Sequence, residues 1–228
     1  MTSILSPLLS SDATPLARTA PTLREAISGF YAVLDREDVE LARALVRTAR
    51  VLQLRIKPRG GRADALDLMR AARMVRAVCD EAGAAFIVND RIDIALAANA
   101  DGVHLGQSDL PLAEARRMLL ELSRPLWVGI STHNVEQVRA AVAGGADYLG
   151  FGPVFATATK ENPDPVQGIA GLEAAVAEAR GVPIVAIGGV QARDAAALYR
   201  AGAQAICAIS AVNGTDDPEA AGRLFQRP

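Results

Sequence analysis

The sequence predicts a single (β/α)8 barrel, and three observations support that prediction. Short apolar runs rich in β-branched residues occur eight times, stretches with helical spacing separate them, and the strand-like runs are apolar at successive positions. Strands that are apolar on both faces are typical of a parallel sheet covered by helices. Eight alternations favour the closed barrel over a doubly wound open sheet, which usually has fewer strands and a GxGxxG motif after the first.

The elements follow one another in a regular order. The strand candidates are residues 29–35 (GFYAVLD), 51–57 (VLQLRIK), 84–90 (AAFIVND), 102–107 (GVHLGQ), 126–132 (LWVGIST), 147–154 (DYLGFGPV), 183–189 (PIVAIGG) and 203–210 (AQAICAIS). Between them apolar residues recur with a period of 3.6, as in residues 39–46 and 65–79. Glycine turns such as EAGAAF and RAGAQA end several of these helices before the next strand. We assign residues 23–228 to the barrel and residues 1–22, rich in Ser, Thr and Pro, to a partly disordered extension.

The composition of the chain limits the classes of function that fit it. The chain has 228 residues, half of them apolar, and a formal net charge of −2. This balance argues against nonspecific nucleic-acid binding and leaves room for a small anionic ligand in a local pocket. Cys79 and Cys207 lack CxxC or His spacing, so we expect two buried, reduced thiols. We also expect no membrane span and no signal peptide, and therefore a cytoplasmic protein.

Polar residues gather where the predicted strands end. In a (β/α)8 barrel these ends and the following loops hold the catalytic groups. In this chain they hold Gln53, Arg55, Lys57, Asn89, Asp90, Gln107, Asp109, Ser131, Thr132, Thr157, Thr159, Lys160, Gly188, Gly189, Ile209 and Ser210. Lys57 and Lys160 are the only lysines among 24 basic residues, which suggests positions where a compact charge suits better than a guanidinium.

Alternation along residues 51–57 places Gln53, Arg55 and Lys57 on one side of the strand. We predict that this side faces the barrel mouth and that the apolar residues between them, Leu52, Leu54 and Ile56, pack against helices. A solvated mouth that holds an anion is a cheaper place for cations than a buried helix layer. A surface edge with extended Arg and Lys side chains is the alternative.

Asp90 and Asp109 follow adjacent predicted strands, so their carboxylates would stand close together. Two such groups repel unless a cation separates them, and Mg2+ accepts both while keeping positions for phosphate oxygens. The alternative for Asp90 is an N-cap of a helix that starts near Arg91.

The later strands indicate a phosphate site. The segments AIGGV and AISAV place small residues where a strand meets a helix, so that backbone N–H groups can face an anion. Residues 155–168 form a long loop with Thr157, Thr159 and Lys160 near its start, which we interpret as a flap over a phosphorylated substrate, with a simple surface loop as the alternative. His104 and His133 match no catalytic or metal-binding spacing. We expect His104 to be a satisfied core or rim histidine, and His133 either to cap a helix or to line the mouth.

The motifs QLRIK, IVNDRIDIALAANADGVHLGQSD, GISTHN, GPVFATATK, AIGGV and AISAV, in this order, resemble those of thiamine-phosphate synthases. The resemblance covers residues 29 to 225 and implies a (β/α)8 barrel. It also implies the family's reaction, in which 4-amino-2-methyl-5-hydroxymethylpyrimidine diphosphate and 4-methyl-5-(2-phosphoethyl)thiazole give thiamine phosphate and pyrophosphate.

Roles carry over from this resemblance position by position. Asp90 and Asp109 would hold Mg2+, and Arg55, Lys57 and Lys160 would be catalytic by stabilising the departing pyrophosphate. Ser131 would touch the pyrimidine, and Thr157 and Thr159 would hold the thiazole phosphate. The implied substrate-binding set is Gln53, Leu54, Arg55, Ile56, Lys57, Asn89, Ser131, Thr157, Ala158, Thr159, Lys160, Gly189, Ile209 and Ser210.

Two departures from the family pattern stand out. Ile56 replaces an acid, which by alternation affects packing more than catalysis, and Ala156 and Ala158 replace prolines, which implies a looser flap. The rival interpretations are a thiazole tautomerase-like paralogue, another phosphate-binding barrel such as a sugar-phosphate isomerase, and a regulator that binds thiazole phosphate without catalysis. The expected partners are the two small-molecule substrates, and the oligomeric state is left open, with a homo-oligomer as one option.

Overall fold

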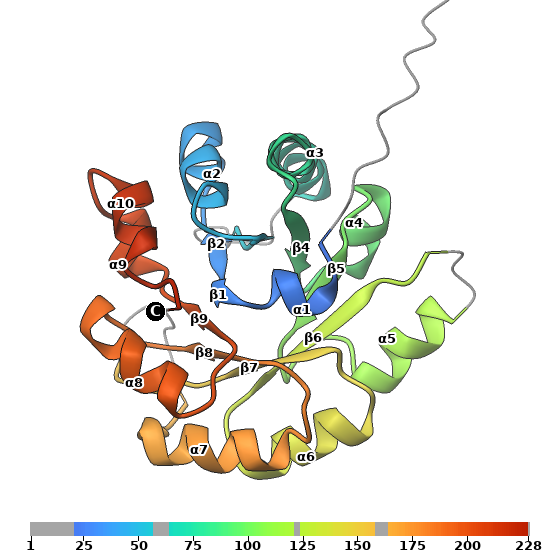
Figure 1. The fold of residues 1–228 in the computed structure, drawn as a ribbon. Helices are drawn as coiled ribbons and strands as arrows, with labels where there is room; N and C mark the ends of the chain where they lie inside the picture. Colours follow the sequence, from blue (N-terminus) through green and yellow to red (C-terminus); the bar gives the residue numbers. More distant parts are fainter. Residues whose placement is uncertain (1–20, 57–63, 121–123, 158–163, 228) are drawn as a thin grey trace, which may run out of the picture.

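Parallel strands form the centre of the molecule, and helices surround them (Figure 1). The computed structural model describes residues 21–56, 64–120, 124–157 and 164–227. Within these ranges every strand pair is parallel, in the order β1-β9-β8-β7-β6-β5-β4-β3-β2. The strands are β1 Gly29–Phe30, β2 Ala32–Leu34, β3 Val51–Leu54, β4 Ala85–Asn89, β5 Gly102–Leu105, β6 Trp127–Thr132, β7 Tyr148–Phe151, β8 Ile184–Ile187 and β9 Ala205–Cys207.

The two short strands at the start occupy one position in the ring. Only Tyr31 separates β1 from β2, and its backbone N–H donates to the carbonyl of Ile206 at 2.8 Å. β1 pairs with β9 while β2 pairs with β3, so this first segment joins the last strand to the second and closes the sheet. All eight predicted strand positions are present, which confirms the predicted barrel.

Helices cover the outer face of this barrel. They are α2 Val39–Val46, α3 Ala65–Ala82, α4 Ile92–Ala97, α5 Leu112–Leu119, α6 Val135–Ala143, α7 Gly168–Glu178, α8 Ala195–Arg200, α9 Ser210–Asn213 and α10 Pro218–Arg223, with a 3-10 turn at Ala192–Asp194. Side-chain caps fix several starts. The carboxylate of Asp38 accepts from the N–H of Leu41 before α2, and Asn134 caps α6 in the same way. Among the described residues, no helix has the length and apolar content needed to cross a bilayer.

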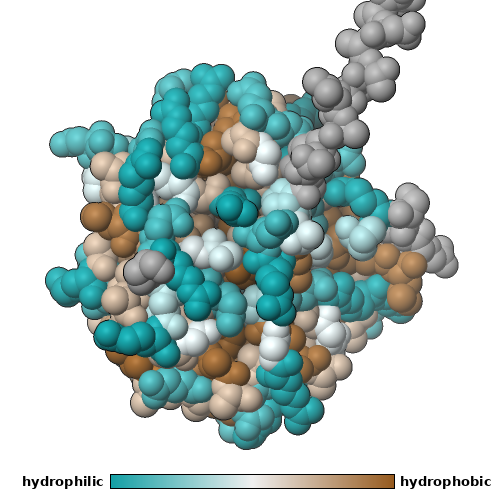
Figure 2. Space-filling model, in the orientation of Figure 1, coloured by the Kyte–Doolittle hydropathy of each residue, from teal (hydrophilic) through white to brown (hydrophobic). Residues whose placement is uncertain are grey.

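The helix α1 Leu23–Ala26 closes the end of the barrel where the strands begin. Ala26 and Ile27 pack with the interior residues Val51 and Ala85, at the starts of β3 and β4. In Figure 1 this helix lies in front of the strands, and Figure 2 shows the same face, where hydrophilic and apolar side chains are mixed. With this end filled, a ligand reaches the interior from the opposite end.

Strand alternation divides the core into two layers. Leu52 and Leu54 belong to the large cluster between sheet and helices, while Val51 belongs to the small cluster inside the barrel. Gln53 also faces inward and is only 5% exposed. The predicted orientation of β3 is therefore confirmed. Cys79 and Cys207 are free and buried, as expected.

Candidate active site

A cavity of about 630 Å3 opens where the strands end. Residues from almost every strand, or from the loop that follows the strand, line this cavity. This is expected because the ends of the parallel strands in a closed barrel all meet at one opening. The predicted site residues that line it are Gln53, Arg55, Asn89, Asp90, Gln107, Asp109, Ser131, Thr157, Gly188, Gly189, Ile209 and Ser210. The polar rim predicted from the sequence therefore forms one continuous pocket.

Asp90 adopts an unusual backbone conformation at the end of β4. Its φ is 63°, and its N–H donates to the carbonyl of His104 at 2.8 Å. A non-glycine residue in the left-handed region costs free energy and often marks a functional position. The alternative role of Asp90 as an N-cap is wrong, because the N-cap of α4 is Arg91.

Asp109 is held by the loop that follows β5. Its Oδ2 accepts from the backbone N–H of Gly106 at 2.6 Å. A Cβ at position 106 would lie 2.9 Å from that same oxygen, so glycine allows the close approach. This bond holds the carboxylate at the wall of the cavity that Asp90 also lines.

A chain of hydrogen bonds crosses the barrel beneath the cavity. Gln53 Nε2 donates to the Tyr31 hydroxyl at 3.0 Å, and the hydroxyls of Tyr31 and Tyr148 are 2.9 Å apart. The Tyr148 hydroxyl lies 3.1 Å from His104 Nδ1, and His104 Nε2 lies 2.9 Å from Ser131 Oγ. We call these five residues the interior chain. They come from five positions around the barrel and link its two sides.

Burial keeps this interior chain uncharged. Burial lowers the pKa of His104 to about 4, and the nearby Arg55 cation lowers it further while Asp109 opposes the shift. Burial likewise raises the pKa of Tyr31 and of Tyr148. It also raises the pKa of the Cys207 thiol to about 12. At neutral pH the interior chain is therefore polar but neutral, and the charged residues that line the same cavity are Arg55, Asp90, Asp109 and Asp164.

Tyr31 and Tyr148 line the cavity but were not among the predicted site residues. Both side chains point into the barrel. The alternation of inward and outward residues along a strand is the one sequence pattern that could have predicted this. Space for Tyr148 comes from Gly129 on the neighbouring strand β6, because a Cβ there would lie 2.1 Å from the Tyr148 ring. Contacts of this kind join residues far apart in the chain, so local patterns do not reveal them.

Two adjacent glycines shape the side of the cavity after β8. Gly188 and Gly189 have φ values of 97° and 65°. A Cβ at Gly189 would lie 2.2 Å from the carbonyl oxygen of Ala156, and one at Gly188 would lie 2.5 Å from Pro153 Cα. No other residue fits this backbone, which faces the cavity together with Ile209 and Ser210.

Several predicted residues do not line the cavity or cannot be placed. The Leu54 and Ile56 side chains pack with the outer cluster, so only their backbone could meet a ligand. Thr132, considered for the rim, is instead buried and donates to the carbonyl of Gly150 at 3.0 Å. The residues outside the described part of the chain are Lys57, Ala158, Thr159 and Lys160.

His133 lines the cavity, as one of its two interpretations predicts, and Asn134 rather than His133 is the N-cap of α6. Its Nδ1 lies 2.5 Å from the carbonyl oxygen of Gly152, and its Nε2 lies 3.3 Å from Asp164 Oδ2. Asp164 lines the same cavity and was not expected there. This pair joins the end of β6 to Asp164, which lies within the predicted flap (residues 155–168) before α7.

Comparisons with known proteins agree with this geometry. The profile of the family "Thiamine monophosphate synthase" matches residues 30–212. The thiamine-phosphate synthase of Methanospirillum hungatei is 43% identical over 204 residues, which are 86% of this chain and 95% of that protein. The enzyme of the same name from Anaeromyxobacter dehalogenans is 45% identical over 205 residues, which are 89% of this chain and 88% of that protein.

A solved structure agrees as well. The thiamine phosphate pyrophosphorylase from Pyrococcus furiosus superposes with a TM-score of 0.79 at 34% identity, covering 90% of this chain and 96% of that one. The sequence match spans the barrel from its first strand to the helix after its last. The chain therefore belongs to the thiamine monophosphate synthase family.

Proposed function

We propose that the protein joins 4-amino-2-methyl-5-(diphosphooxymethyl)pyrimidine to 4-methyl-5-(2-phosphoethyl)thiazole, with release of pyrophosphate and formation of thiamine phosphate. One observation carries the proposal: a single cavity gathers the carboxylates of Asp90 and Asp109, an arginine and a glycine-walled backbone site at the mouth of the barrel. That set matches two phosphorylated substrates, one of them a diphosphate. The names of the relatives give the product, thiamine phosphate, and the resemblance of the motifs implies the two substrates.

The carboxylates fit a magnesium ion that the substrate completes. Among the described residues no group of three His, Cys, Asp or Glu side chains could hold a metal alone. Mg2+ is often bound by one or two carboxylates with water and phosphate oxygens, and Asp90 and Asp109 offer that number from the segments after the adjacent strands β4 and β5. When bound, the ion would neutralise charge on the diphosphate. The role of the two acids is to hold the diphosphate in line with the pyrimidine.

Arg55 is positioned to act on the leaving group. It follows the end of β3 at the cavity wall, and its N–H extends the sheet by donating to Leu34 at 2.9 Å. A guanidinium there stabilises negative charge as the C–O bond to pyrophosphate breaks. Lys57 and Lys160 are expected to share this task, and both lie outside the described residues.

The cavity floor favours a dissociative reaction. His104 is neutral with both ring nitrogens engaged, and the Cys207 thiol is protonated at neutral pH, so neither is poised as a base or a nucleophile. The amino group of the pyrimidine can itself stabilise a methylene cation when pyrophosphate leaves. The thiazole nitrogen then forms the new C–N bond at short range, so positioning and electrostatics suffice.

The experiment is pyrophosphate release by the purified protein with both substrates, first with Mg2+ and then with excess EDTA. The proposal predicts release only when Mg2+ and the thiazole phosphate are both present, with one thiamine phosphate formed per pyrophosphate. Saturable binding of the thiazole phosphate without product would instead indicate the tautomerase-like paralogue or a regulator. Product formation unaffected by EDTA would remove the metal role and keep the synthase.

A further inference from the structure

The seam between the first strand and the last strand of the barrel changes at the cavity end. Where the strands begin, β1 pairs with β9, and the N–H of Tyr31 donates to the carbonyl of Ile206 at 2.8 Å. Continuing this register would bring Val33 of β2 opposite Ile209. β9 ends before that point, and the chain turns into α9. The carbonyl of Val33 therefore takes its hydrogen bond from a different donor.

The side chain of Asn213 provides that donor. Its Nδ2 donates to the Val33 carbonyl at 2.9 Å, although the two residues lie 180 positions apart in the sequence. Asn213 is only 5% exposed, so water does not replace this bond when the amide is removed. The bond closes the seam at the level where the backbone of β9 no longer does.

The backbone of Asn213 is held as well. Its carbonyl accepts from Arg36 Nη2 at 3.2 Å, and Arg36 lies just after β2. Its N–H donates to the carbonyl of Ile209 at 2.8 Å within α9. We call Asn213 and Arg36 the seam tether, because together they connect the first strand of the barrel to Ile209.

Ile209 and Ser210 lie at the other end of this helical turn and line the cavity together with Gly189. Because α9 has four residues, a displacement of Asn213 is carried to Ile209 within a single turn. The buried side chain of Val212 packs α9 against the core, but apolar contacts are not directional. Hydrogen bonds are directional, so the seam tether fixes the rotation of this turn and hence the direction of the backbone that faces the cavity.

We propose that Asn213 is a positioning residue that holds the backbone of Ile209 and Ser210 in the geometry that binds the phosphate of the thiazole substrate. This inference rests on the proposed function, in which the glycine-walled backbone site takes that phosphate. The residues proposed to act on the departing diphosphate follow other strands of the barrel: Arg55, Asp90 and Asp109. Loss of the tether should therefore weaken binding of the thiazole phosphate and leave the chemical step nearly unchanged.

The first test is hydrogen exchange of backbone amides, measured by NMR on the ligand-free protein. The amides of Val212 and Asn213 donate to the carbonyl of Ile209, so they report on the turn that the tether holds. We expect both to exchange roughly tenfold faster in Asn213→Ala, whereas Val138, whose amide donates within α6, keeps its rate. Equal acceleration in α6 and α9 would show a general loss of stability, and unchanged exchange would show no tether, so either result refutes the proposal. This readout needs no substrate.

The second test is a steady-state comparison of Asn213→Ala with the native protein. We expect the KM for the thiazole phosphate to rise roughly tenfold, with kcat and the KM for the pyrimidine diphosphate within about twofold of native. Arg36→Ala removes only the exposed half of the tether and should raise the same KM about threefold. Thr215→Val is the matched control, because it removes a 2.8 Å hydrogen bond to the carbonyl of Val212 at the same end of α9, and that bond does not reach the first strand. Its KM should equal the native value.

A lower kcat with an unchanged KM for the thiazole phosphate would contradict the positioning role. If the native protein forms no thiamine phosphate, the proposed function fails, and calorimetric binding of the thiazole phosphate then tests the inference alone. Markedly weaker binding by Asn213→Ala would support the inference, whereas equal binding, or no binding by the native protein, would overturn it.

Discussion

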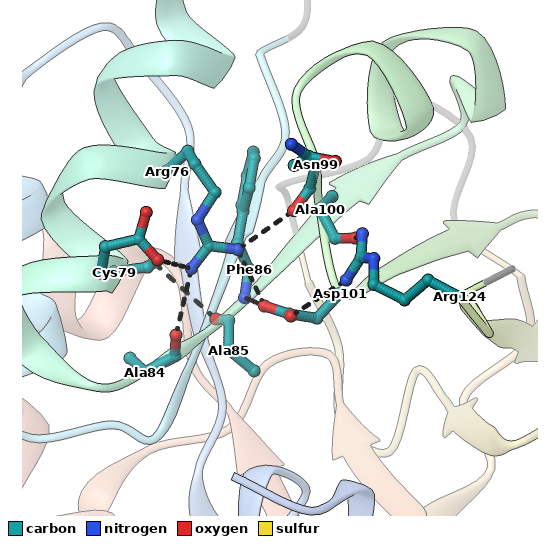
Figure 3. Close-up of polar contacts among 10 residues, drawn as sticks. Arg76, Cys79, Ala84, Ala85, Phe86, Asn99, Ala100, Asp101 and Arg124 are labelled. Atoms are coloured by element: carbon teal, nitrogen blue, oxygen red, sulfur yellow. Dashed lines mark hydrogen bonds and ion pairs between the residues drawn. The ribbon is translucent and has the colours of Figure 1, made fainter. Parts of the chain in front are cut away.

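The two ends of the barrel use polar residues differently. At the end where the strands begin, Asp101 is 6% exposed, and its Oδ2 accepts from Phe86 N–H at 2.8 Å and from Arg76 Nη1 at 2.9 Å. Arg124 lies on the other side of this carboxylate (Figure 3), with its Nη1 3.5 Å from Oδ1. We call these three charged residues the base cluster. At the cavity end, the interior chain is neutral and its last members face open space.

This difference separates stability from function. The charges of the base cluster pair with one another and with the backbone, so they hold the start of the strands together. The Arg76 guanidinium also pairs with Asp80 at 3.0 Å and lies 5.5 Å from the centre of the Phe86 ring. In this fold the start of the strands generally serves stability and the end serves chemistry. Substitutions at the two ends should therefore change different measured quantities.

The largest effect is expected for Asp90→Asn at the cavity end. Asparagine tolerates the left-handed backbone of this position, so the fold should persist while a metal-binding charge is lost. We expect turnover to fall roughly 100- to 1000-fold with little change in the midpoint of urea unfolding. Asp93→Asn, on the exposed side of α4 and paired with Arg91, is the matched control. Native turnover in Asp90→Asn would exclude the metal role.

The opposite result is expected for Asp101→Ala in the base cluster. This change leaves the Phe86 N–H and the Arg76 cation without their buried acceptor. The free energy of unfolding should fall by about 3 kcal/mol, as when a buried pair loses one partner. The kcat of the remaining folded protein should not change. A loss of kcat without a loss of stability would contradict the division between the two ends.

A pH titration sharpens the comparison inside the cavity end. The pKa of His104 is 6.5 in the unfolded chain and about 4 in the folded one. Between these values the unfolded state binds the extra proton, so stability falls as the pH is lowered from 6.5 to 4 and is constant above 6.5. The loss should be about 3 kcal/mol by pH 4. Urea unfolding at several pH values should show this loss in the native protein. His104→Gln should lack this pH dependence of the free energy of unfolding.

The smallest effect is expected for Asp147→Ala. Asp147 repeats the arrangement of Asp101: its Oδ2 accepts from Val128 N–H at 2.6 Å and lies 2.6 Å from Arg116 Nη2. Its side chain is 30% exposed, so water replaces part of what is lost. We expect a loss of about 1 kcal/mol in the free energy of unfolding. A loss equal to that of Asp101→Ala would mean that burial does not control the strength of this arrangement.

Strand-level features were predictable from the sequence, whereas contacts across the barrel were not. Alternation correctly placed Gln53 and Arg55 at the mouth, and the strand ends correctly brought Asp90 and Asp109 to one cavity. The same approach placed Thr132 at the rim of the cavity. Its side chain instead points away from the cavity, because it alternates with Ser131, and it is buried.

Three features depend on tertiary geometry. The Tyr31–Tyr148 contact joins residues 117 positions apart, and the left-handed Asp90 depends on the loop around it. The third is a repeated acceptor before alternate strands: Gln204 accepts from Ile184 N–H at 2.8 Å before β9, as Asp101 and Asp147 do before β5 and β7.

The most direct test of the account is the rate of pyrophosphate release in the first turnover, measured against Mg2+ concentration for the native protein and Asp90→Asn. The cavity end is proposed to act on the departing diphosphate through an ion held by Asp90 and Asp109. The native rate should rise with Mg2+ and saturate, and Asp90→Asn should need at least tenfold more Mg2+ or never reach that rate. A rate that is independent of Mg2+ and equal in both proteins would contradict the account.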